Sequence, residues 1–250
     1  MSGVDFQRRH YDDLVRHERP TRWGLSCGWR DRFDPALLER RPALRRAIEK
    51  LLDRVVPAGA GTVLDLACGT AYYWPLLAPR CRRLVGVDLS PAMAAAGRRR
   101  HVAEGGFSGL VACAEAGRLP LATGSVDVAL AVDALHHVAR LRETLAEVRR
   151  VLAPGGAFVA VEPNVLNPVV LAAHLVPPEE RGALRTGHPW AVTAALRETF
   201  EEVSVEPVTY VSGVESARAL RLVELLEPLF ARPPLSWVAL RRVYRARRRS

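Results

Sequence analysis

An acid followed by a loop of small residues stands in the stretch "VLDLACGTAYYWPLLA", which covers residues 63–78. The spacing is D-x-A-x-G-x-A, formed by Asp65, Ala67, Gly69 and Ala71. A dinucleotide site would read G-x-G-x-x-G and would hold a pyrophosphate at a helix N-terminus. Asp65 would lie close to that pyrophosphate, and two negative groups at about 4 Å repel by several kcal/mol at an intermediate dielectric. The stretch therefore favours a cationic ligand over NAD, and its small residues let the backbone lie against that ligand.

Two further acids follow at the ends of later apolar runs. Asp88 lies 23 residues after Asp65, about where an acid can accept both hydroxyls of a ribose. Glu115 lies between Ala114 and Ala116 in "CAEAGRLP", where it could meet the amino group of an adenine. An ammonium, a ribose and an adenine are all parts of S-adenosylmethionine, so the three acids predict this cofactor. The alternatives are a helix cap or a turn for the two aspartates and an exposed loop position for Glu115.

Short apolar runs must position these acids. Strands are expected at 62–66 and in "RRLVGVDLS", "GLVACAEAG", "SVDVALAVDAL" and "AFVAVEP". Helices are expected over 36–56 and in "AMAAAGRRRH" and "RLRETLAEVRRVL". Strands that are apolar throughout are typical of a parallel sheet covered on both faces. The alternation predicts an α/β protein with an open, doubly wound sheet, whose ligand lies at the carboxyl ends of the strands.

The chain is expected to divide into four parts. These are an N-terminal helical cap at 1–60, an S-adenosylmethionine-binding core at 61–163, a lid or substrate insertion at 164–192, and the C-terminal part of the sheet with a basic tail at 193–250. The insertion, "NVLNPVVLAAHLVPPEERGALRTGHPW", is apolar and rich in proline, which is typical of a lid above a sheet. The last segment, "LSWVALRRVYRARRRS", is expected to be an edge strand or another helix.

Positive charge is concentrated at the end of the chain. The formal net charge is +9, and six arginines in the last ten residues, "RRVYRARRRS", account for all but +3 of it. Because the excess belongs to a tail, nucleic acid is disfavoured as a partner. The apolar "LEPLFARPPLSWVAL" and the arginines after it could rest on an anionic membrane as a peripheral contact. A solvated tail explains the arginines equally well.

The remaining composition is that of an ordinary globular protein, with 49% hydrophobic residues. No run approaches the ~20 apolar residues of a membrane span, and "MSGVDFQRRHYDD" lacks the apolar core of a secretory signal. We therefore expect a cytoplasmic protein, either monomeric or a homodimer. The four cysteines, Cys27, Cys68, Cys81 and Cys113, are scattered without any C-x-x-C pair, so neither a metal site nor a disulfide framework is expected.

Four sequence motifs follow one another along the chain at ordinary spacing. They are "VLDLACGT", "VGVDLS", "AEAGRLPLATGSVDVALAVDALHHV" and "EVRRVLAPGGAFVAVEPN", which span residues 62–164. In this region the chain resembles the class I S-adenosylmethionine-dependent methyltransferases, close to the group of ubiquinone and menaquinone biosynthesis. The resemblance implies a Rossmann-like, seven-stranded sheet of order 3-2-1-4-5-7-6 with an antiparallel last strand, and S-adenosyl-L-homocysteine as the product. In two departures, Ala71 replaces the usual last glycine and "YYW" at 72–74 is bulky, so the floor of the cleft is expected to differ.

The loop, the acids and this resemblance together predict the cofactor contacts. Asp133 is expected to face the methionine end of the cofactor, and its alternative is a helix cap. Tyr11, in "HYDDL", resembles the N-terminal tyrosine that closes over the cofactor in the family, and its alternative is packing of the first helix. The full predicted set is Tyr11, Asp65, Ala67, Cys68, Gly69, Thr70, Asp88, Leu89, Met93, Ala114, Glu115, Ala116, Asp133 and Leu135.

Two histidines are the candidates for catalysis. Methyl transfer is an in-line displacement, in which alignment can supply ~7–11 kcal/mol. A general base is needed only if the acceptor arrives protonated. His136 is expected to face the acceptor and His137 to pack against the cofactor, although both could simply begin a helix. Glu162, His174 and His188 are lesser candidates, each read first as structural.

The expected acceptor is a small, hydrophobic molecule such as a quinone, a polyketide, a terpenoid or another secondary metabolite. "VLNPVVLAAHLV" could line its pocket, together with Trp23, Trp29, Trp74 and Trp190, unless these residues only complete the core. Oxygen or carbon is the expected acceptor atom, with nitrogen next. The alternatives are an RNA-modifying methyltransferase that uses the basic tail and a non-catalytic cofactor-binding module.

Overall fold

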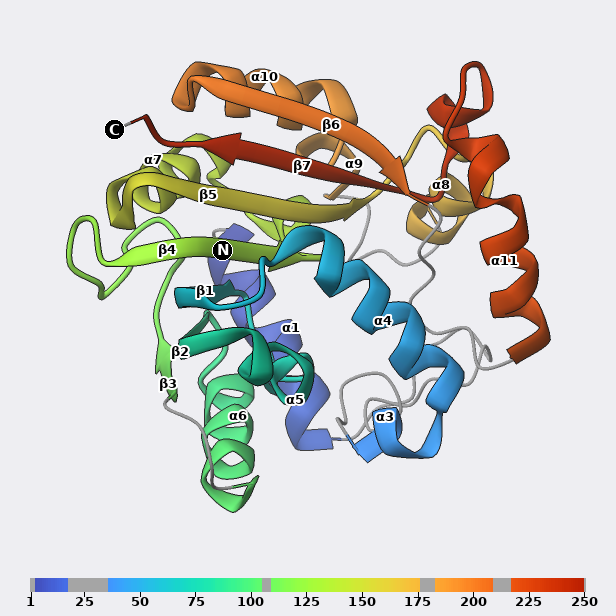
Figure 1. The fold of residues 1–250 in the computed structure, drawn as a ribbon. Helices are drawn as coiled ribbons and strands as arrows, with labels where there is room; N and C mark the ends of the chain where they lie inside the picture. Colours follow the sequence, from blue (N-terminus) through green and yellow to red (C-terminus); the bar gives the residue numbers. More distant parts are fainter. Residues whose placement is uncertain (1–2, 18–35, 105–108, 176–182, 209–216, 250) are drawn as a thin grey trace.

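Seven strands form a single sheet in the computed structural model of the chain, which describes residues 3–17, 36–104, 109–175, 183–208 and 217–249 (Figure 1). Their order is β3-β2-β1-β4-β5-β7-β6, as the family resemblance implies. β7 runs antiparallel to both of its neighbours, whereas the other pairs are parallel. The strands are β1 (Ala60–Leu66), β2 (Cys81–Asp88), β3 (Gly109–Cys113), β4 (Val126–Val132), β5 (Leu152–Pro163), β6 (Glu202–Val208) and β7 (Arg241–Arg247).

The apolar strands are buried on both faces, as the unbroken hydrophobic runs predict. Val63 of β1 packs in one core layer with Ile48 and Leu52 of α4 (Pro42–Val55). Its neighbour Leu64 points to the opposite layer, which also contains Leu145 of α7 (Leu141–Val151). Successive strand residues therefore pack under helices on opposite sides, which is the doubly wound arrangement.

Helices connect the strands and cover the sheet. The helix expected over 36–56 is interrupted at Arg41, because Pro42 has no backbone N–H to donate and disfavours a helical conformation in the residue before it. The other described elements are α1 (Gly3–His17), α3 (Ala36–Arg40), α5 (Trp74–Leu77), α6 (Pro91–Glu104), α8 (Pro168–Leu175), α9 (Ala183–Thr186), α10 (Pro189–Thr199), α11 (Ala217–Phe230) and the 3₁₀ helices η1 (Ala78–Arg80), η2 (Leu135–His137) and η3 (Leu235–Val238).

The prediction of a basic tail is wrong for residues 241–247, which form β7 between β5 and β6. It is an interior strand, not an edge strand. Val243 and Tyr244 are fully buried, and the arginines between such positions are tied to the fold. Arg245 forms an ion pair with Glu206 at 2.6 Å and donates to the Arg54 carbonyl oxygen. The positive charge that suggested a solvated tail therefore belongs largely to a strand.

No described helix is long and apolar enough to cross a membrane. The inserted segment between β5 and β6 contributes α8 and α9 before α10 begins. The part of the predicted lid at 176–182 lies outside the described residues, as do Trp23, Cys27 and Trp29.

Gly86 of β2 leaves the space that Trp74 occupies. A Cβ atom at Gly86 would lie 2.8 Å from Cζ2 of Trp74 and 2.7 Å from Sγ of Cys68, closer than real contacts allow. We expect Gly86→Ala to lower the free energy of unfolding by ~1–3 kcal/mol through overpacking. Urea unfolding measures this change. The control is Gly117→Ala, where the nearest atom would be 3.8 Å away; equal effects of the two substitutions would contradict the close packing.

Candidate functional site

The loop after β1 follows an alternating backbone pattern. Ala67, Gly69 and Ala71 all have left-handed backbone angles, with φ of 57°, 53° and 62°. For alanine this conformation costs ~1–2 kcal/mol per residue. The loop is held by Cys68, whose N–H donates to the Val87 carbonyl oxygen at 3.1 Å. At Gly69 an added Cβ would find only the Met93 sulfur within 4 Å, at 4.0 Å, so the space beside the loop is open to an approaching ligand.

Asp65 is a buried acid beneath this loop. Its carboxylate is 2% exposed and accepts a hydrogen bond from Nε1 of Trp74 at 2.9 Å. Burial raises the pKa of Asp65 from 3.8 to about 7; the Trp74 hydrogen bond opposes this shift and the nearby charge of Asp88 adds to it. The bulky aromatic run that set this chain apart from the family pattern thus supplies the donor that holds Asp65. A cation beside Asp65 would relieve the cost of its charge.

Asp88, at the tip of β2, organises the same loop. Its Oδ2 accepts from the Gly69 N–H and its Oδ1 from the Ser90 N–H, both at 2.8 Å. Burial raises the pKa of Asp88, the two backbone donors lower it, and the charge of Asp12 raises it. Each carboxylate oxygen has two lone pairs, so Asp88 keeps capacity for further donors.

Asp12, on α1, was not found by sequence reasoning. It is buried, and its Oδ1 accepts from the Ser90 hydroxyl and from the Ala92 N–H at the start of α6. The contact attaches α1 to the helix that follows β2. Asp12 and Ser90 are 78 residues apart, so no local pattern in "HYDDL" could have paired them.

The cofactor residues predicted beyond β2 gather at the same edge of the sheet. The Ala114 N–H donates to the Asp88 carbonyl oxygen at 2.9 Å, which places the start of the Glu115 loop beside β2. Met93 is buried below Gly69. Leu135 has no exposed surface and packs in the core. Of the predicted cofactor contacts, its side chain is therefore the least accessible to a ligand. Thr70 and Cys68 are buried, Leu89, Glu115 and Ala116 are half-buried, and Ala67 is exposed.

Asp133 follows β4 and forms an ion pair with Arg241, the first residue of β7. Asp133 also has a left-handed φ of 52°. Arg241 is 9% exposed, so the pair is largely shielded from water. The sequence interpretation placed Arg241 in a tail, and so it did not predict that this side chain lies beside Asp133 at the carboxyl end of β4.

His136 is held by a buried carboxylate. Its Nδ1 lies 2.6 Å from Oε2 of Glu162, which has no exposed surface. Oε1 of Glu162 accepts from the N–H groups of Ala134 and Leu135, at 3.0 and 2.8 Å. Because Glu162 accepts at both oxygens, Nδ1 of the ring is the donor and Nε2 is the basic nitrogen in the neutral ring. The two histidines do form the short helix η2, the structural alternative from the sequence, but Glu162 also fixes the ring of His136.

Segments distant in sequence pack around this pair of histidines. The His137 ring meets the Tyr11 ring edge-on at 5.7 Å, and the His174 ring of α8 meets the His136 ring at 5.6 Å. The Thr186 hydroxyl of α9 donates to the His136 carbonyl oxygen at 2.6 Å. Helix α1 and the inserted segment therefore both reach the end of β4.

The remaining candidates lie at two places, the start of α10 and the loop after β1. His188 is the N-cap of α10, where its ring accepts from the Trp190 N–H. Trp190 is 70% exposed, whereas Trp74 is buried beneath the loop. These positions do not form a common pocket for an acceptor.

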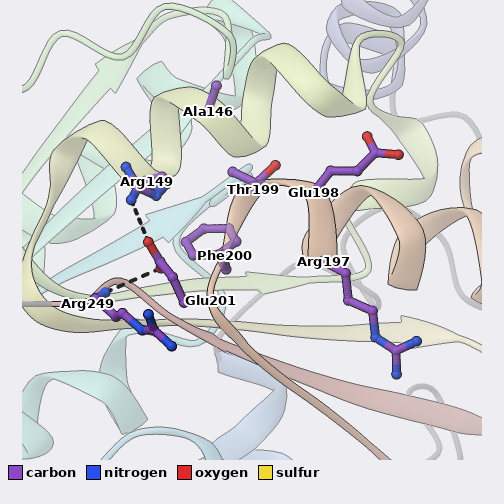
Figure 2. Close-up of a pocket in the computed structure, with 8 residues that line it drawn as sticks. All are labelled: Ala146, Arg149, Arg197, Glu198, Thr199, Phe200, Glu201 and Arg249. Atoms are coloured by element: carbon purple, nitrogen blue, oxygen red, sulfur yellow. Dashed lines mark hydrogen bonds and ion pairs between the residues drawn. The ribbon is translucent and has the colours of Figure 1, made fainter.

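A depression between α7, α10 and the end of β7 lies at the opposite edge of the sheet (Figure 2). It lies where α7 leads into β5 and α10 leads into β6, at the amino ends of those strands. Arg149 pairs there with Glu201 at 2.6 Å, and Glu201 also accepts from the Arg249 N–H. Among the described residues, no group of three or more His, Cys, Asp or Glu side chains is arranged to hold a metal ion.

Comparisons with known proteins find methyltransferases among the similar sequences. Residues 64–160 match the methyltransferase-domain family. The chain is 33% identical over 135 residues to a probable S-adenosylmethionine-dependent methyltransferase of Mycolicibacterium smegmatis, covering 54% of this chain and 50% of that protein. It is 35% identical over 133 residues to the ubiquinone/menaquinone biosynthesis C-methyltransferase UbiE of Dinoroseobacter shibae, covering 50% and 52%. The chain thus spans about half the length of the curated relatives it matches.

Solved structures share the fold. A geranyl diphosphate C-methyltransferase from Streptomyces coelicolor A3(2) superposes with a TM-score of 0.62 at 16% identity, covering 100% of this chain and 99% of that one. The YcgJ protein from Bacillus subtilis gives a TM-score of 0.59 at 18% identity, covering 82% and 99%. At these identities the likeness concerns the fold alone.

Proposed function

We propose that this chain transfers a methyl group from S-adenosylmethionine to an oxygen or a carbon of a small, hydrophobic molecule. The match of residues 64–160 to the methyltransferase-domain family supports the type of reaction. Asp65 is the observation that carries the proposal. A buried acid with another acid nearby and an indole N–H as its donor is costly to ionise without a positive partner. The ammonium of S-adenosylmethionine would supply that partner, whereas a pyrophosphate would increase the repulsion.

The remaining edge residues fit the other parts of the cofactor. Asp88 has lone pairs left for ribose hydroxyls after it has accepted from the loop. Glu115 is half-buried in the loop that begins beside β2, which supports its predicted contact with an adenine amino group. Tyr11 lies against His137, so α1 is in a position to cover the site.

The bound cofactor supplies an electrophilic methyl group on a sulfonium. His136 would act as the base for an acceptor that arrives with a proton, because Glu162 fixes its ring and directs the basic nitrogen away from the carboxylate. His137 and Tyr11 would exclude water from the methyl end. No side chain needs to form a covalent bond, since alignment alone supplies much of the rate.

The acceptor is proposed from the inserted segment and from the similar proteins. Helix α8, in the apolar stretch "PVVLAAHL", contacts His136 through the ring of His174. The similar proteins include a malonyl-[acyl-carrier protein] O-methyltransferase of Pectobacterium atrosepticum and the quinone and geranyl diphosphate C-methyltransferases named above. These names support oxygen or carbon as the acceptor atom. The RNA alternative is less well supported, because four of the six arginines assigned to a free tail lie in β7.

Asp88→Ala tests the cofactor proposal. We expect the substitution to weaken binding of S-adenosyl-L-homocysteine at least tenfold, because charge-assisted hydrogen bonds are worth roughly 1.5–3 kcal/mol each. Titration calorimetry measures the dissociation constant. Unfolding experiments run beside it, because Asp88 also accepts two loop N–H groups and its loss should lower stability.

The matched control is Asp13→Ala, which removes an exposed acid of α1. An unchanged dissociation constant for Asp88→Ala, or tighter binding of NAD than of S-adenosyl-L-homocysteine by the wild-type chain, would contradict the proposal. Formation of S-adenosyl-L-homocysteine with quinone, polyketide or terpenoid acceptors then separates an enzyme from a non-catalytic module.

A further inference from the structure

An exposed apolar surface lies beside the carboxyl ends of the strands, on α11, η3 and α8. Leu225 of α11 is 75% exposed and Trp237 of η3 is 65% exposed. Several large apolar side chains gathered on neighbouring elements, unlike single ones, mark an interaction surface. We refer to this set as the outer apolar surface. Its members are Leu222, Leu225 and Leu229 of α11, Leu235 and Trp237 of η3, and Val169, Leu171 and Leu175 of α8.

The three elements of this surface are connected. Helix α11 packs against η3. The side chain of Asn167, just before α8, donates to the Val238 carbonyl oxygen at 2.6 Å, and Asn164 donates to that of Trp237 at 2.8 Å. In Figure 1, α8 and α11 both lie on the side to which the arrow of β6 points. The outer apolar surface therefore spans elements that are joined through η3.

The charges of α11 are sorted between its two faces. Its acids, Glu224 and Glu227, pair with Lys50 and Arg54 of α4 at 2.6 and 2.7 Å. Arg218 and Arg221 precede Leu222 and Leu225 by one helical turn, and so lie on the same side of α11 as the exposed leucines. The acids are thus neutralised on the inner side, and the outer side combines leucines with positive charge.

From this arrangement we propose that the outer apolar surface binds an anionic lipid bilayer. Leucines and an indole that enter the interface, with arginines beside them, are the combination by which amphipathic helices bind such membranes. A second copy of the chain fits less well, because a symmetric contact would bring arginines against arginines while the acids of α11 are already paired. A bilayer also adapts to a surface built from three separate elements, whereas a protein partner must match its shape.

The proposal keeps the apolar part of the membrane contact predicted for "LEPLFARPPLSWVAL", which forms the end of α11 and η3, and changes its charged part. Four of the six arginines at the end of the chain lie in β7, so the positive charge of the contact is assigned instead to Arg218 and Arg221 of α11, and α8 is added to its apolar part. Helix α8 then has two sides with different contacts. His174 meets the His136 ring, while Val169 is 70% exposed on the outer apolar surface. Only helix α8 would thus separate a bound bilayer from His136.

Vesicle co-sedimentation tests the binding. The full chain is expected to sediment with mixed vesicles of phosphatidylcholine and phosphatidylglycerol, and to remain in solution with vesicles of phosphatidylcholine alone. Added salt should weaken the binding. Leu225→Glu, Trp237→Ala and the double variant Arg218→Glu/Arg221→Glu should each reduce the bound fraction at least tenfold. These side chains are exposed, so the variants should keep the wild-type circular dichroism spectrum.

Two substitutions serve as matched controls. Trp190→Ala removes an indole that is equally exposed but lies on α10, and Arg99→Glu reverses an exposed charge on α6. Both should bind vesicles like the wild type. The proposal is overturned by absence of sedimentation with the mixed vesicles, by equal loss in test and control variants, or by a dimer in sedimentation velocity that Leu225→Glu dissociates. The measurement needs no methyl transfer, so its failure and a failure of the proposed function are separate results.

Discussion

Replacing His136 with alanine is expected to lower turnover by about 10²–10⁴-fold for an acceptor that arrives with a proton. Binding of S-adenosyl-L-homocysteine should stay within about twofold of the wild-type value, because Asp65 and Asp88, the acids proposed to hold the ammonium and the ribose, lie on β1 and β2. The physical reason is the buried contact between the His136 ring and Glu162 at 2.6 Å, which sets the orientation of the ring. Initial rates and calorimetry on the same preparations measure the two quantities.

Two readouts separate a base from a structural residue. Added imidazole should restore part of the lost turnover in His136→Ala, because the space left by the ring can accept it. The wild-type rate should also rise with pH as an imidazole loses its proton, and this rise should disappear in the variant. Undiminished turnover in His136→Ala, or a loss that imidazole does not restore and that leaves the pH profile unchanged, would assign His136 to the structure of η2.

Glu162→Gln and His188→Asn complete the series. Glu162→Gln should also reduce turnover, because the amide would present N–H groups to the ring and backbone donors that Glu162 now accepts. His188→Asn changes a histidine that caps α10 for another good capping residue, and it should leave turnover unchanged.

Asp65→Asn is expected to stabilise the ligand-free protein and to weaken cofactor binding at the same time. In the folded protein the pKa of Asp65 is raised from 3.8 to about 7, chiefly by burial. The protonated side chain is the one that burial tolerates, so its contribution to stability is fully present below about pH 4 and is lost as the pH rises to about 7. Asparagine is not subject to this loss and can still accept from Trp74.

The two effects are measured separately. The gain of Asp65→Asn over the wild type in urea unfolding should be small near pH 4 and should reach about 2–4 kcal/mol near pH 8, since one pKa unit corresponds to about 1.4 kcal/mol. The affinity for S-adenosylmethionine should fall at least tenfold, because a charge-assisted contact is lost. Asp13→Asn, at an exposed position, should change neither quantity. Unchanged affinity in Asp65→Asn would remove Asp65 from the cofactor site.

Local patterns were sufficient for β1 to β5 and for the acids at the ends of β1 and β2. Asp65 and Asp88 each stand where an unbroken apolar run ends, and parallel strands bring such ends together. The partners of these acids could not be predicted in the same way. The sequence around Trp74 indicated only a bulky side chain, because the space for its ring is left by Gly86 on β2. Asp12 joins Ser90 across 78 residues, and such contacts leave no periodic signal.

The arginine-rich end shows why composition misled the sequence interpretation. β7 is crowded with arginines, yet its buried positions, Val243, Tyr244 and Ala246, are enough to seat it between two strands. Arg241 then pairs with Asp133 from 108 positions earlier. The charges of this strand are balanced by distant segments, so net charge per segment could not distinguish a strand from a tail.

The position of β7 also has a consequence for biosynthesis. β6 is synthesised before β7 but pairs only with it among the described strands, and β5 pairs with β7 along one side. While the ribosome is still making residues 241–247, both strands therefore present open hydrogen-bonding edges. Such edges attract other chains, so translation products that stop short of β7 should be held by chaperones or aggregate.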